Sequence, residues 1–520
     1  MAPPGPSAGV RLLLLRRLLS TGTEAAAGAA AAPTAAATAT ATAAKAGNKG
    51  DSLALYRRLV ALGRSGEGSV SRALSKWVRQ GGALPVQDLV EHVKELRKYK
   101  RYGHALELMD WMVNARGTTM SHANHAIQLD LIYKVRGIEA AEAYFADLPD
   151  PAKNHRTYGA LLNCYCSAKM EEKATDLYNK MVELGICSSE LLFSNLMSIY
   201  MKLGRHGKVD SLFEEMKVVK NVKPSNMTCR ILMTSYAQSN KIDAIEELLK
   251  EMAEKDVALG WSAYSTLASI YINAGLVEKA ESALKKLEGL VGPDDGMLPF
   301  DFLISLYASV GNLSEVNRVW DVIKAKFSKV TKRSYLGMLQ ALYKLNDIDG
   351  MKQIYVDWES NYKFYYVRLT NMMIRGHLKL DLTEEAEALW EKAKEKGTKF
   401  DSKTCELFLD HYMGKGGMNL ALNWLENMIK LPNKAGKLDQ DKIHKFQKYF
   451  EEHKDADGAE RFCNCLRKLG CFDGKAYESL LRTYLAAGKE SYSLRQRIKN
   501  DKIGICYDIW ELLNRIGDKG

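Results

Sequence analysis

Cysteine and histidine, the side chains that most often bind metals, lack the spacing for such chemistry in this 520-residue chain. The nine cysteines include no Cys-x-x-Cys pair, and most occupy positions typical of helix packing. Neither the His-x-Glu and Cys-x-x-Cys set of a zinc deaminase, nor a Gly-x-x-x-x-Gly-Lys-[Ser/Thr] loop, nor a His-Glu-x-x-His pair occurs. The ten histidines are scattered. We therefore predict that the chain is not an enzyme and takes no cofactor, metal or small-molecule substrate, and that its cysteines are reduced.

Basic side chains are the second group that could do chemistry, because they can bind phosphate. The net charge is +11, of which the first 50 residues contribute +4 and the remainder +7. Two clusters stand out, Lys94, Arg97, Lys98, Lys100 and Arg101 near one end, and Arg495, Arg497, Lys499 and Lys502 near the other. A mildly basic chain is compatible with nucleic-acid binding, and a solvated helix face explains each cluster equally well.

The elements that carry these side chains are repeated along the chain. Tyrosines recur at intervals of 35 or 36 residues, at Tyr165, Tyr200, Tyr236, Tyr271 and Tyr307. Tyr412 and Tyr484 fall close to later multiples of that interval. Self-similarity at such a period indicates stacked supersecondary units, each in contact with its neighbours, rather than one closed core.

Each repeated unit has the pattern of two helices joined by a tight turn. Apolar residues have helical spacing from Tyr158 to Tyr165, and again from Ala174 to Met181. Gly or Asn follows four of the first five tyrosines by four residues, where the first helix must end in a left-handed conformation. The pattern predicts an all-α protein, and the lack of an apolar run of about 18 residues predicts no membrane span.

These residues resemble the pentatricopeptide repeat family, whose unit contains an aromatic residue, two apolar residues, Tyr, a turn Gly, Ala and Met. The segment 155–189 is the clearest match, and the units 190–225, 226–260, 261–296 and 297–331 follow it closely. Weaker units occupy 332–365, 366–401 and 402 to about 441. The spacing and the recurring Met favour this family over the tetratricopeptide repeat, a 34-residue peptide-binding helix pair. The resemblance, to P-type plant organellar members, implies a right-handed superhelical α-solenoid of about ten to eleven helix-turn-helix repeats.

The resemblance also implies which residues meet RNA, because each repeat of the family meets one base of a single strand. The family reads that base with the fifth residue of the first helix and the last residue of the repeat. The corresponding pairs are Gly159 with Ser189, Ser194 with Ser225, Arg230 with Gly260, Ser265 with Gly296, Asp301 with Thr331, Leu336 with Tyr365, and Thr370 with Asp401. Only the last pair is one that the family commonly uses, for guanine. Of these, the candidate RNA-binding residues are Gly159, Ser189, Ser194, Ser225, Arg230, Ser265, Thr370 and Asp401.

The second residue of each repeat packs against the base plane in the family and is normally aliphatic. Four of seven second positions keep that type here, at Leu191, Met227, Leu298 and Val367, whereas the others are Arg156, Ser262 and Arg333. The reading pairs depart further from the family, since Gly159 has no side chain, Leu336 cannot hydrogen-bond and Asp301 is negative. We therefore do not expect a long sequence-specific footprint.

Two functions are compatible with a scaffold that matches the family pattern closely and with reading pairs that mostly depart from it. In the first, the chain binds single-stranded organellar RNA and acts in mitochondrial RNA processing, stability or translation. In the second, it is a structural constituent of the mitochondrial ribosome that docks ribosomal RNA or ribosomal proteins.

The first 50 residues have the character of an organellar transit peptide followed by a disordered Ala/Thr-rich tract. Arginines are interleaved with leucines from Arg11 to Leu19, and Glu24 is the single acidic residue of this segment. The run 17–20 resembles mitochondrial presequences cut shortly after an Arg. A plastid peptide would contain more serine, so mitochondrion is predicted with chloroplast as the alternative; a disordered tail with a chance Arg-Leu cluster is the remaining explanation.

Domain boundaries follow from these patterns. Residues 1–50 form the leader, 51–119 N-terminal capping helices with a degenerate repeat, 120–441 the repeat array, 442–490 degenerate repeats, and 491–520 a C-terminal capping helix and tail. The segment 116–154 fits the repeat phase poorly. The run 431–437 is a predicted loop that lengthens its unit.

Overall fold

The computed structural model describes residues 54–62, 68–82, 85–116, 120–186, 189–219, 222–362, 366–398, 401–431, 438–489, 498 and 507–516. All regular structure within these ranges is helical, as the sequence predicts. No helix there is long and apolar enough to cross a membrane. The predicted transit peptide and the basic cluster between Arg495 and Lys502 lie outside the described residues.

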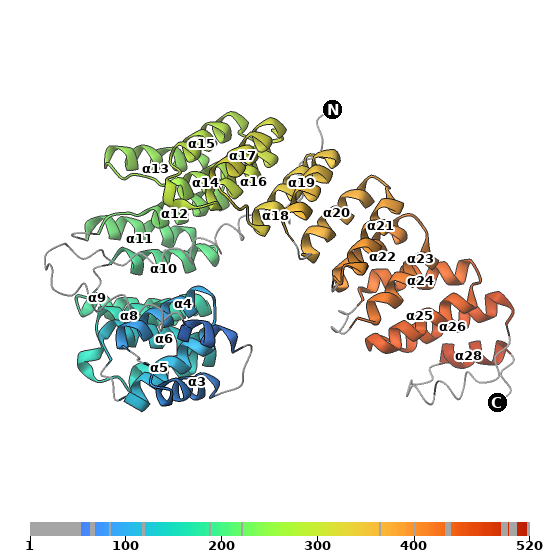
Figure 1. The fold of residues 1–520 in the computed structure, drawn as a ribbon, viewed down its shortest axis with the longest axis horizontal. Helices are drawn as coiled ribbons and strands as arrows, with labels where there is room; N and C mark the ends of the chain where they lie inside the picture. Colours follow the sequence, from blue (N-terminus) through green and yellow to red (C-terminus); the bar gives the residue numbers. More distant parts are fainter. Residues whose placement is uncertain are drawn as a thin grey trace. The chain divides into compact units, whose positions relative to one another are not determined.

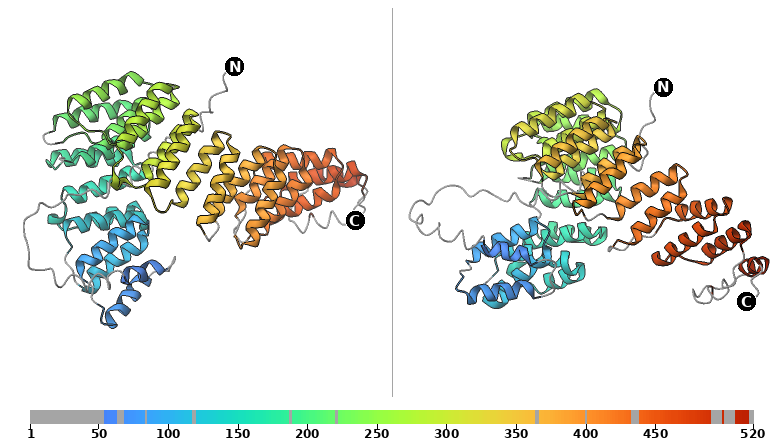
Figure 2. Two further views of the ribbon diagram at one scale, coloured as in Figure 1. Left: turned by 45° about the horizontal axis from the view of Figure 1, so that its top comes forward. Right: turned by 45° about the vertical axis from the view of Figure 1, so that its right-hand side comes forward.

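The chain divides into two compact units, Met1–Val291 and Gly292–Gly520. The tyrosine spacing runs across this boundary and does not predict it. Within each unit, helix pairs follow one another in chain order (Figures 1 and 2). The first helix of one pair packs against the first helix of the next from α6 to α14 and from α16 to α22. This stacking sets the amino-terminal ends of consecutive first helices in a row.

Six helix pairs are described in the first unit, after helix α3 (Ser69–Arg79). The pairs are α4 (Val86–Lys98) with α5 (Tyr102–Arg116), α6 (His122–Arg136) with α7 (Ile138–Ala146), α8 (His155–Ala168) with α9 (Glu171–Glu183), α10 (Glu190–Lys202) with α11 (His206–Val218), α12 (Asn226–Gln238) with α13 (Ile242–Glu254), and α14 (Trp261–Asn273) with α15 (Val277–Gly289). The segment that fits the repeat phase poorly forms α6 and α7, which are joined at Gly137 alone.

Five helix pairs are described in the second unit. They are α16 (Leu298–Val310) with α17 (Leu313–Lys326), α18 (Lys332–Lys344) with α19 (Ile348–Asn361), α20 (Val367–Lys379) with α21 (Thr383–Glu395), α22 (Ser402–Gly414) with α23 (Met418–Ile429), and α24 (Gln440–Glu452) with α25 (Ala456–Leu469). Helices α26 (Gly474–Ala487) and α28 (Tyr507–Arg515) follow. Eleven pairs among the described residues agree with the predicted ten to eleven repeats.

The turn inside each pair has the left-handed residue that the sequence predicts. Gly204, Asn240 and Gly275 have φ angles of 72°, 58° and 76°. In the weaker repeats, Asn346 and Asp381 take the same role with φ angles of 61° and 59°. Non-glycine residues with a short polar side chain tolerate this conformation best, which explains Asn and Asp there.

The repeated tyrosines connect neighbouring repeats by hydrogen bonds as well as by packing. Tyr271 Oη donates to Glu246 Oε1 at 2.6 Å in the second helix of the preceding repeat, and Lys279 Nζ lies 2.8 Å from the same oxygen. Tyr412 donates to Glu387 Oε1 at 2.7 Å in the same way. Burial raises the pKa of Tyr271, and the hydrogen bond to Glu246 raises it further. The tyrosine spacing is thus the spacing of an interface between repeats.

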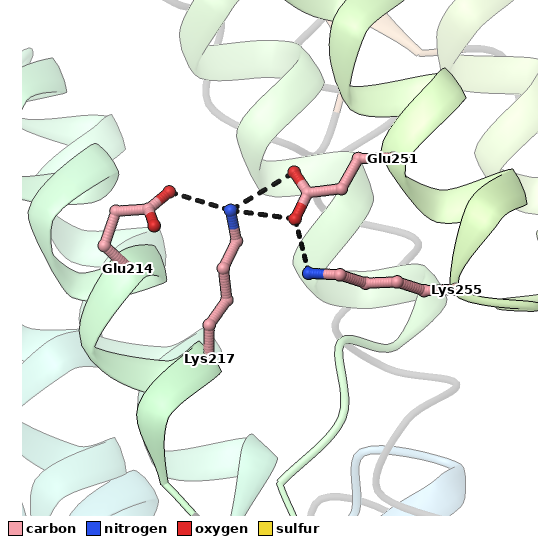
Figure 3. Close-up of polar contacts among 4 residues, drawn as sticks. All are labelled: Glu214, Lys217, Glu251 and Lys255. Carbon is pink, nitrogen blue, oxygen red and sulfur yellow. Dashed lines mark hydrogen bonds and ion pairs between the residues drawn. The ribbon is translucent and has the colours of Figure 1, made fainter.

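Second helices of consecutive repeats are joined by ion pairs. Figure 3 shows Lys217 of α11 between Glu214 and Glu251, with Lys255 on the far side of Glu251. Lys217 Nζ lies 2.8 Å from an oxygen of each glutamate, and Lys255 Nζ lies 2.6 Å from Glu251 Oε1. Burial alone would lower the pKa of Lys217, but the hydrogen bonds to both glutamates outweigh it and the pKa is raised. Charges here are neutralised within the protein.

The C-terminal helix α28 covers the end of the second unit. Ile509 and Leu513 are buried in one apolar cluster with Tyr477 and Leu481 of α26. A solenoid needs such a cover, because its last repeat would otherwise expose an apolar face to water.

Candidate nucleic-acid interface

The residues predicted to read RNA lie at the amino-terminal ends of the first helices. In five repeats the predicted last residue is the N-cap of the next first helix, at Ser189, Ser225, Gly260, Thr331 and Asp401. The predicted last residue Gly296 instead precedes Met297, which is the N-cap of α16. The fifth residue of a repeat lies about one turn into the first helix of that same repeat. Consecutive first helices pack side by side, so these positions follow one edge of each unit.

Gly159, predicted to pair with Ser189, lies against the next first helix. A Cβ on Gly159 would lie 3.0 Å from Leu192 Cδ2 of the next first helix, so the glycine allows α8 and α10 to approach closely. Ser189 begins α10 with an extended backbone, and its side chain makes no capping hydrogen bond. The residue at the fifth position here serves packing between the repeats.

Ser194 and Ser225 are brought together, but through a carboxylate. Their hydroxyls donate to Glu190 Oε1 at 2.5 and 2.6 Å, and the hydroxyl of Thr228 donates to the same oxygen at 2.5 Å. Ser194 is fully buried. Sequence reasoning missed Glu190 because the three hydroxyl groups meet only after α10 and α12 pack. A base at this repeat would face hydroxyl groups that already donate hydrogen bonds to the Glu190 carboxylate.

Arg230 and Ser265 are also directed into the protein. Arg230 Nε donates to Thr266 Oγ1 of the next first helix at 3.2 Å, and burial lowers the pKa of its guanidinium. Ser265 is 3% exposed and donates to the backbone oxygen of Ser262 at 2.9 Å. The backbone N–H of Gly260, predicted as the partner of Arg230, donates to Asn226 Oδ1 at 2.6 Å.

Thr370 was assigned to the fifth position, and the structure corrects this assignment by one residue. Helix α20 begins at Val367 with Tyr366 as its N-cap, so the fifth residue is Asn371. Thr370 is fully buried, with its hydroxyl 3.1 Å from Tyr355 Oη. The preceding repeat ends at Tyr366 and not at Tyr365, which itself lies outside the described residues.

Asn371 and Asp401 meet directly. Asn371 Nδ2 donates to Asp401 Oδ1 at 3.3 Å, and the hydroxyl of Thr404 donates to Asn371 Oδ1 at 2.7 Å. Asp401 Oδ1 also accepts the backbone N–H of Thr404 at 3.3 Å as the N-cap of α22. Both side chains are half-buried, and among the described residues Asp401 Oδ2 has no hydrogen-bond partner. This arrangement holds an amide and a carboxylate in fixed positions at the helix edge.

Asp301, the negatively charged fifth residue, is largely buried. Its side chain is 12% exposed, and Oδ2 lies 3.5 Å from Nε of Arg333. Burial raises the pKa of the Asp301 carboxyl. The negative charge at this fifth position is therefore shielded by the basic residue at the second position of the next repeat.

The corrected register also changes the second position of α20, from Val367 to Arg368. That position is Arg333 in α18, Arg368 in α20 and Lys403 in α22, at intervals of 35 residues, and all three are exposed. Val367, predicted as the second residue, is the first. Ala386 and Asp381 could have revealed this phase, since they occupy the small-residue and turn positions of the repeat when counted from Val367.

No group of three or more His, Cys, Asp or Glu side chains in the described ranges could hold a metal ion. The described cysteines are free thiols, and burial raises the pKa of Cys405 to about 11. A thiol with such a pKa stays protonated near neutral pH and is a poor nucleophile.

Residues 156–186, 192–219 and 369–398 match the PPR repeat family, and residues 211–281 match the pentatricopeptide repeat domain family. The chain is 39% identical to the mitochondrial pentatricopeptide repeat-containing protein At4g01990 of Arabidopsis thaliana, over 89% of this chain and 92% of that protein. It is 35% identical to the large ribosomal subunit protein mL101 (rPPR4) of the same plant, over 89% and 94%. Among solved structures, that of PPR10 from maize covers 90% of this chain and 70% of that one, with 15% identity and a TM-score of 0.45.

Proposed function

The chain belongs to the pentatricopeptide repeat family, and we propose that it is an RNA-binding scaffold of mitochondrial gene expression. Single-stranded RNA would lie along the amino-terminal ends of the first helices, and the protein would act in the processing, stability or translation of organellar transcripts. The observation that carries this proposal is the arrangement of Asn371 and Asp401, with Thr404 orienting both side chains.

The chemistry of this pair favours particular bases. Asn371 Nδ2 has a second hydrogen that can donate to a base carbonyl, and Asp401 Oδ2 can accept from a ring N–H. Uracil and guanine present a carbonyl beside a ring N–H on their Watson–Crick edges, whereas adenine and cytosine present an unprotonated ring nitrogen there. The fifth-and-last pair of this repeat therefore fits uracil or guanine.

Mitochondrial placement rests on relatives and on the leader. At4g01990 is named a mitochondrial protein, and it is similar to this chain over most of both sequences. The acid-poor, arginine-rich start of the chain agrees with import into that organelle.

A constituent of the mitochondrial ribosome is the second candidate. It is favoured by the 35% identity to a protein named as part of the large ribosomal subunit. It is also favoured by Gly159, Ser194 and Ser265, whose fifth positions serve packing or internal hydrogen bonds. Sedimentation with the large subunit at high salt, with no binding to free oligonucleotides, would select this candidate over the first.

The test is a binding measurement on purified protein with 20-nucleotide unstructured RNAs that differ at single positions. Asn371→Ala should weaken binding about tenfold where uracil or guanine meets this repeat, and much less elsewhere, because a lost base contact costs about 1–3 kcal/mol. Asp401→Ser should act similarly and still supply an N-cap. Asn317→Ala, on an exposed site of the second helix α17, is the matched control. Equal RNA affinities of the wild type and these three variants would refute the proposed base-reading role of Asn371 and Asp401.

A further inference from the structure

The second unit carries a basic row along its first-helix edge, formed by Arg333, Arg368 and Lys403. They occupy the second position of α18, α20 and α22, three helices that pack in series. Since neighbouring packed helices lie about 8–10 Å apart, the row offers one cation per repeat at a regular interval. A repeat of this family meets one nucleotide, and each nucleotide carries one phosphate.

The charges of the basic row are not fully neutralised by ion pairs within the protein. Arg368 and Lys403 are exposed and make no hydrogen bond or ion pair with other described residues. Arg333 is 62% exposed, and its 3.5 Å contact with Asp301 leaves the outer part of the guanidinium open. Acidic residues close by in sequence are Asp401, which caps α22, and Glu406, one turn after Lys403.

Two other lysines of the same unit, Lys392 and Lys415, are ion-paired inside the protein. Lys392 lies 2.9 Å from Glu359, and Lys415 at a turn lies 2.7 Å from Asp381. These lysines neutralise carboxylates of the preceding repeat. Arg368 and Lys403, in contrast, make no ion pair with other described residues and lie on the edge where the fifth and last positions also lie.

We propose that the basic row binds successive phosphates of the RNA, so that the second unit contacts the strand through the RNA backbone. This inference rests on the proposed RNA-binding function and names the part of the RNA that this edge contacts. The position normally takes an aliphatic residue that packs against a base, and an arginine or lysine head group replaces that contact with a charge-assisted hydrogen bond to phosphate. Binding through this row adds affinity that does not depend on sequence.

The test compares the salt dependence of RNA binding in two triple variants of the full chain. The first variant is Arg333→Gln, Arg368→Gln and Lys403→Gln. The control removes three exposed lysines of the second helices, by Lys324→Gln, Lys352→Gln and Lys394→Gln, and so changes the net charge equally. Affinity for an unstructured 20-nucleotide RNA is measured by fluorescence anisotropy from 50 to 200 mM KCl.

The slope of log affinity against log salt should fall by about 2 in the basic-row variant, because each phosphate contact on a single strand contributes about 0.7. Over this salt range the wild-type protein should then lose about 20-fold more affinity than the variant. The control should keep the wild-type slope, and the loss in the basic-row variant should be equal for RNAs of different sequence.

Four results would overturn the inference. An unchanged slope in the basic-row variant, or an equal fall in the control, would show that these residues are not specific phosphate contacts. A loss confined to one RNA sequence would show base contacts instead. Wild-type protein that binds no RNA would refute both this inference and the proposed function, whereas wild-type binding with an unchanged variant refutes this inference alone. Circular dichroism of both variants checks that they are folded.

Discussion

The first-helix edges of the two units are built on one scaffold but present different chemistry. In the first unit the second position is basic at Arg156 but apolar at Leu191 and Met227, and hydroxyl groups of two successive repeats converge on Glu190. In the second unit the second position is apolar at Leu298, and it is basic in the three following repeats, at Arg333, Arg368 and Lys403. The tyrosine-to-carboxylate hydrogen bond between repeats occurs in both units. Contacts that hold repeats together thus recur in both units, while the first-helix edge, the proposed RNA-binding edge, varies.

Glu190→Ala should have the largest effect on stability. It removes the acceptor of three hydroxyl hydrogen bonds and leaves the buried hydroxyl of Ser194 without its carboxylate, at a cost of about 2 kcal/mol. The loss should appear in urea unfolding monitored by circular dichroism. RNA affinity at moderate salt should change less than twofold, because the cluster is structural. A large loss of affinity in a protein of unchanged stability would instead make Glu190 part of the binding edge.

Tyrosine-to-phenylalanine changes should be equal in the two units. Tyr271→Phe and Tyr412→Phe each remove a hydrogen bond to a carboxylate and keep the ring, so each should cost about 1.5 kcal/mol. Urea unfolding of the two variants measures this directly. Costs that differ by more than about 1 kcal/mol would contradict the idea of a common scaffold.

Alkaline pH should weaken the same interface. The pKa of Tyr271 and that of Tyr412 are raised in the folded protein, chiefly by burial and then by the glutamate. A raised folded pKa stabilises the fold fully below the unfolded value, near pH 10, and this stability is lost as the pH rises toward the folded value. Stability measured from pH 8 to 11 should therefore fall above about pH 10. The fall should be smaller in the double phenylalanine variant, and an identical fall would exclude these tyrosines as its cause.

Leu191→Ala should have the smallest effect. The side chain is 49% exposed, so its loss should cost less than about 0.5 kcal/mol of stability. If the first unit packs Leu191 against a base, RNA affinity should fall about threefold through lost apolar contact, with an unchanged salt slope. Leu191→Ala would then lower affinity without changing the salt slope, whereas the basic-row variant would lower both affinity and slope. This difference would distinguish the two edges. A changed slope in Leu191→Ala would erase that distinction.

The scaffold was predictable because packing repeats itself. A tyrosine that must reach the preceding repeat recurs at the length of one repeat, so Tyr165 to Tyr307 predicted the helix pairs. The turn residue was predictable where it is Gly or Asn. It was missed at Asp381, and with it the phase of α20, which moved the expected contact from Asn371 to Thr370.

The edge was less predictable because its chemistry depends on residues from adjacent repeats. Ser194 and Ser225 are unremarkable in sequence, and only the packing of α10 against α12 brings both to Glu190. Likewise, Asp301 is shielded by Arg333 from the following helix. Family positions predict which residues would face a ligand, but the side chains that contact these residues within the protein are set by the fold.

Asp401 combines two roles in one carboxylate, since it begins α22 and forms half of the proposed reading pair. The backbone amide of Thr404, which donates to Asp401 Oδ1, is consequently a built-in reporter of occupancy. Hydrogen exchange at that amide responds to any ligand that stiffens or releases the first turn of α22. Strand engagement at this repeat could thus be followed on the unmodified protein, one amide at a time, without labelling either partner.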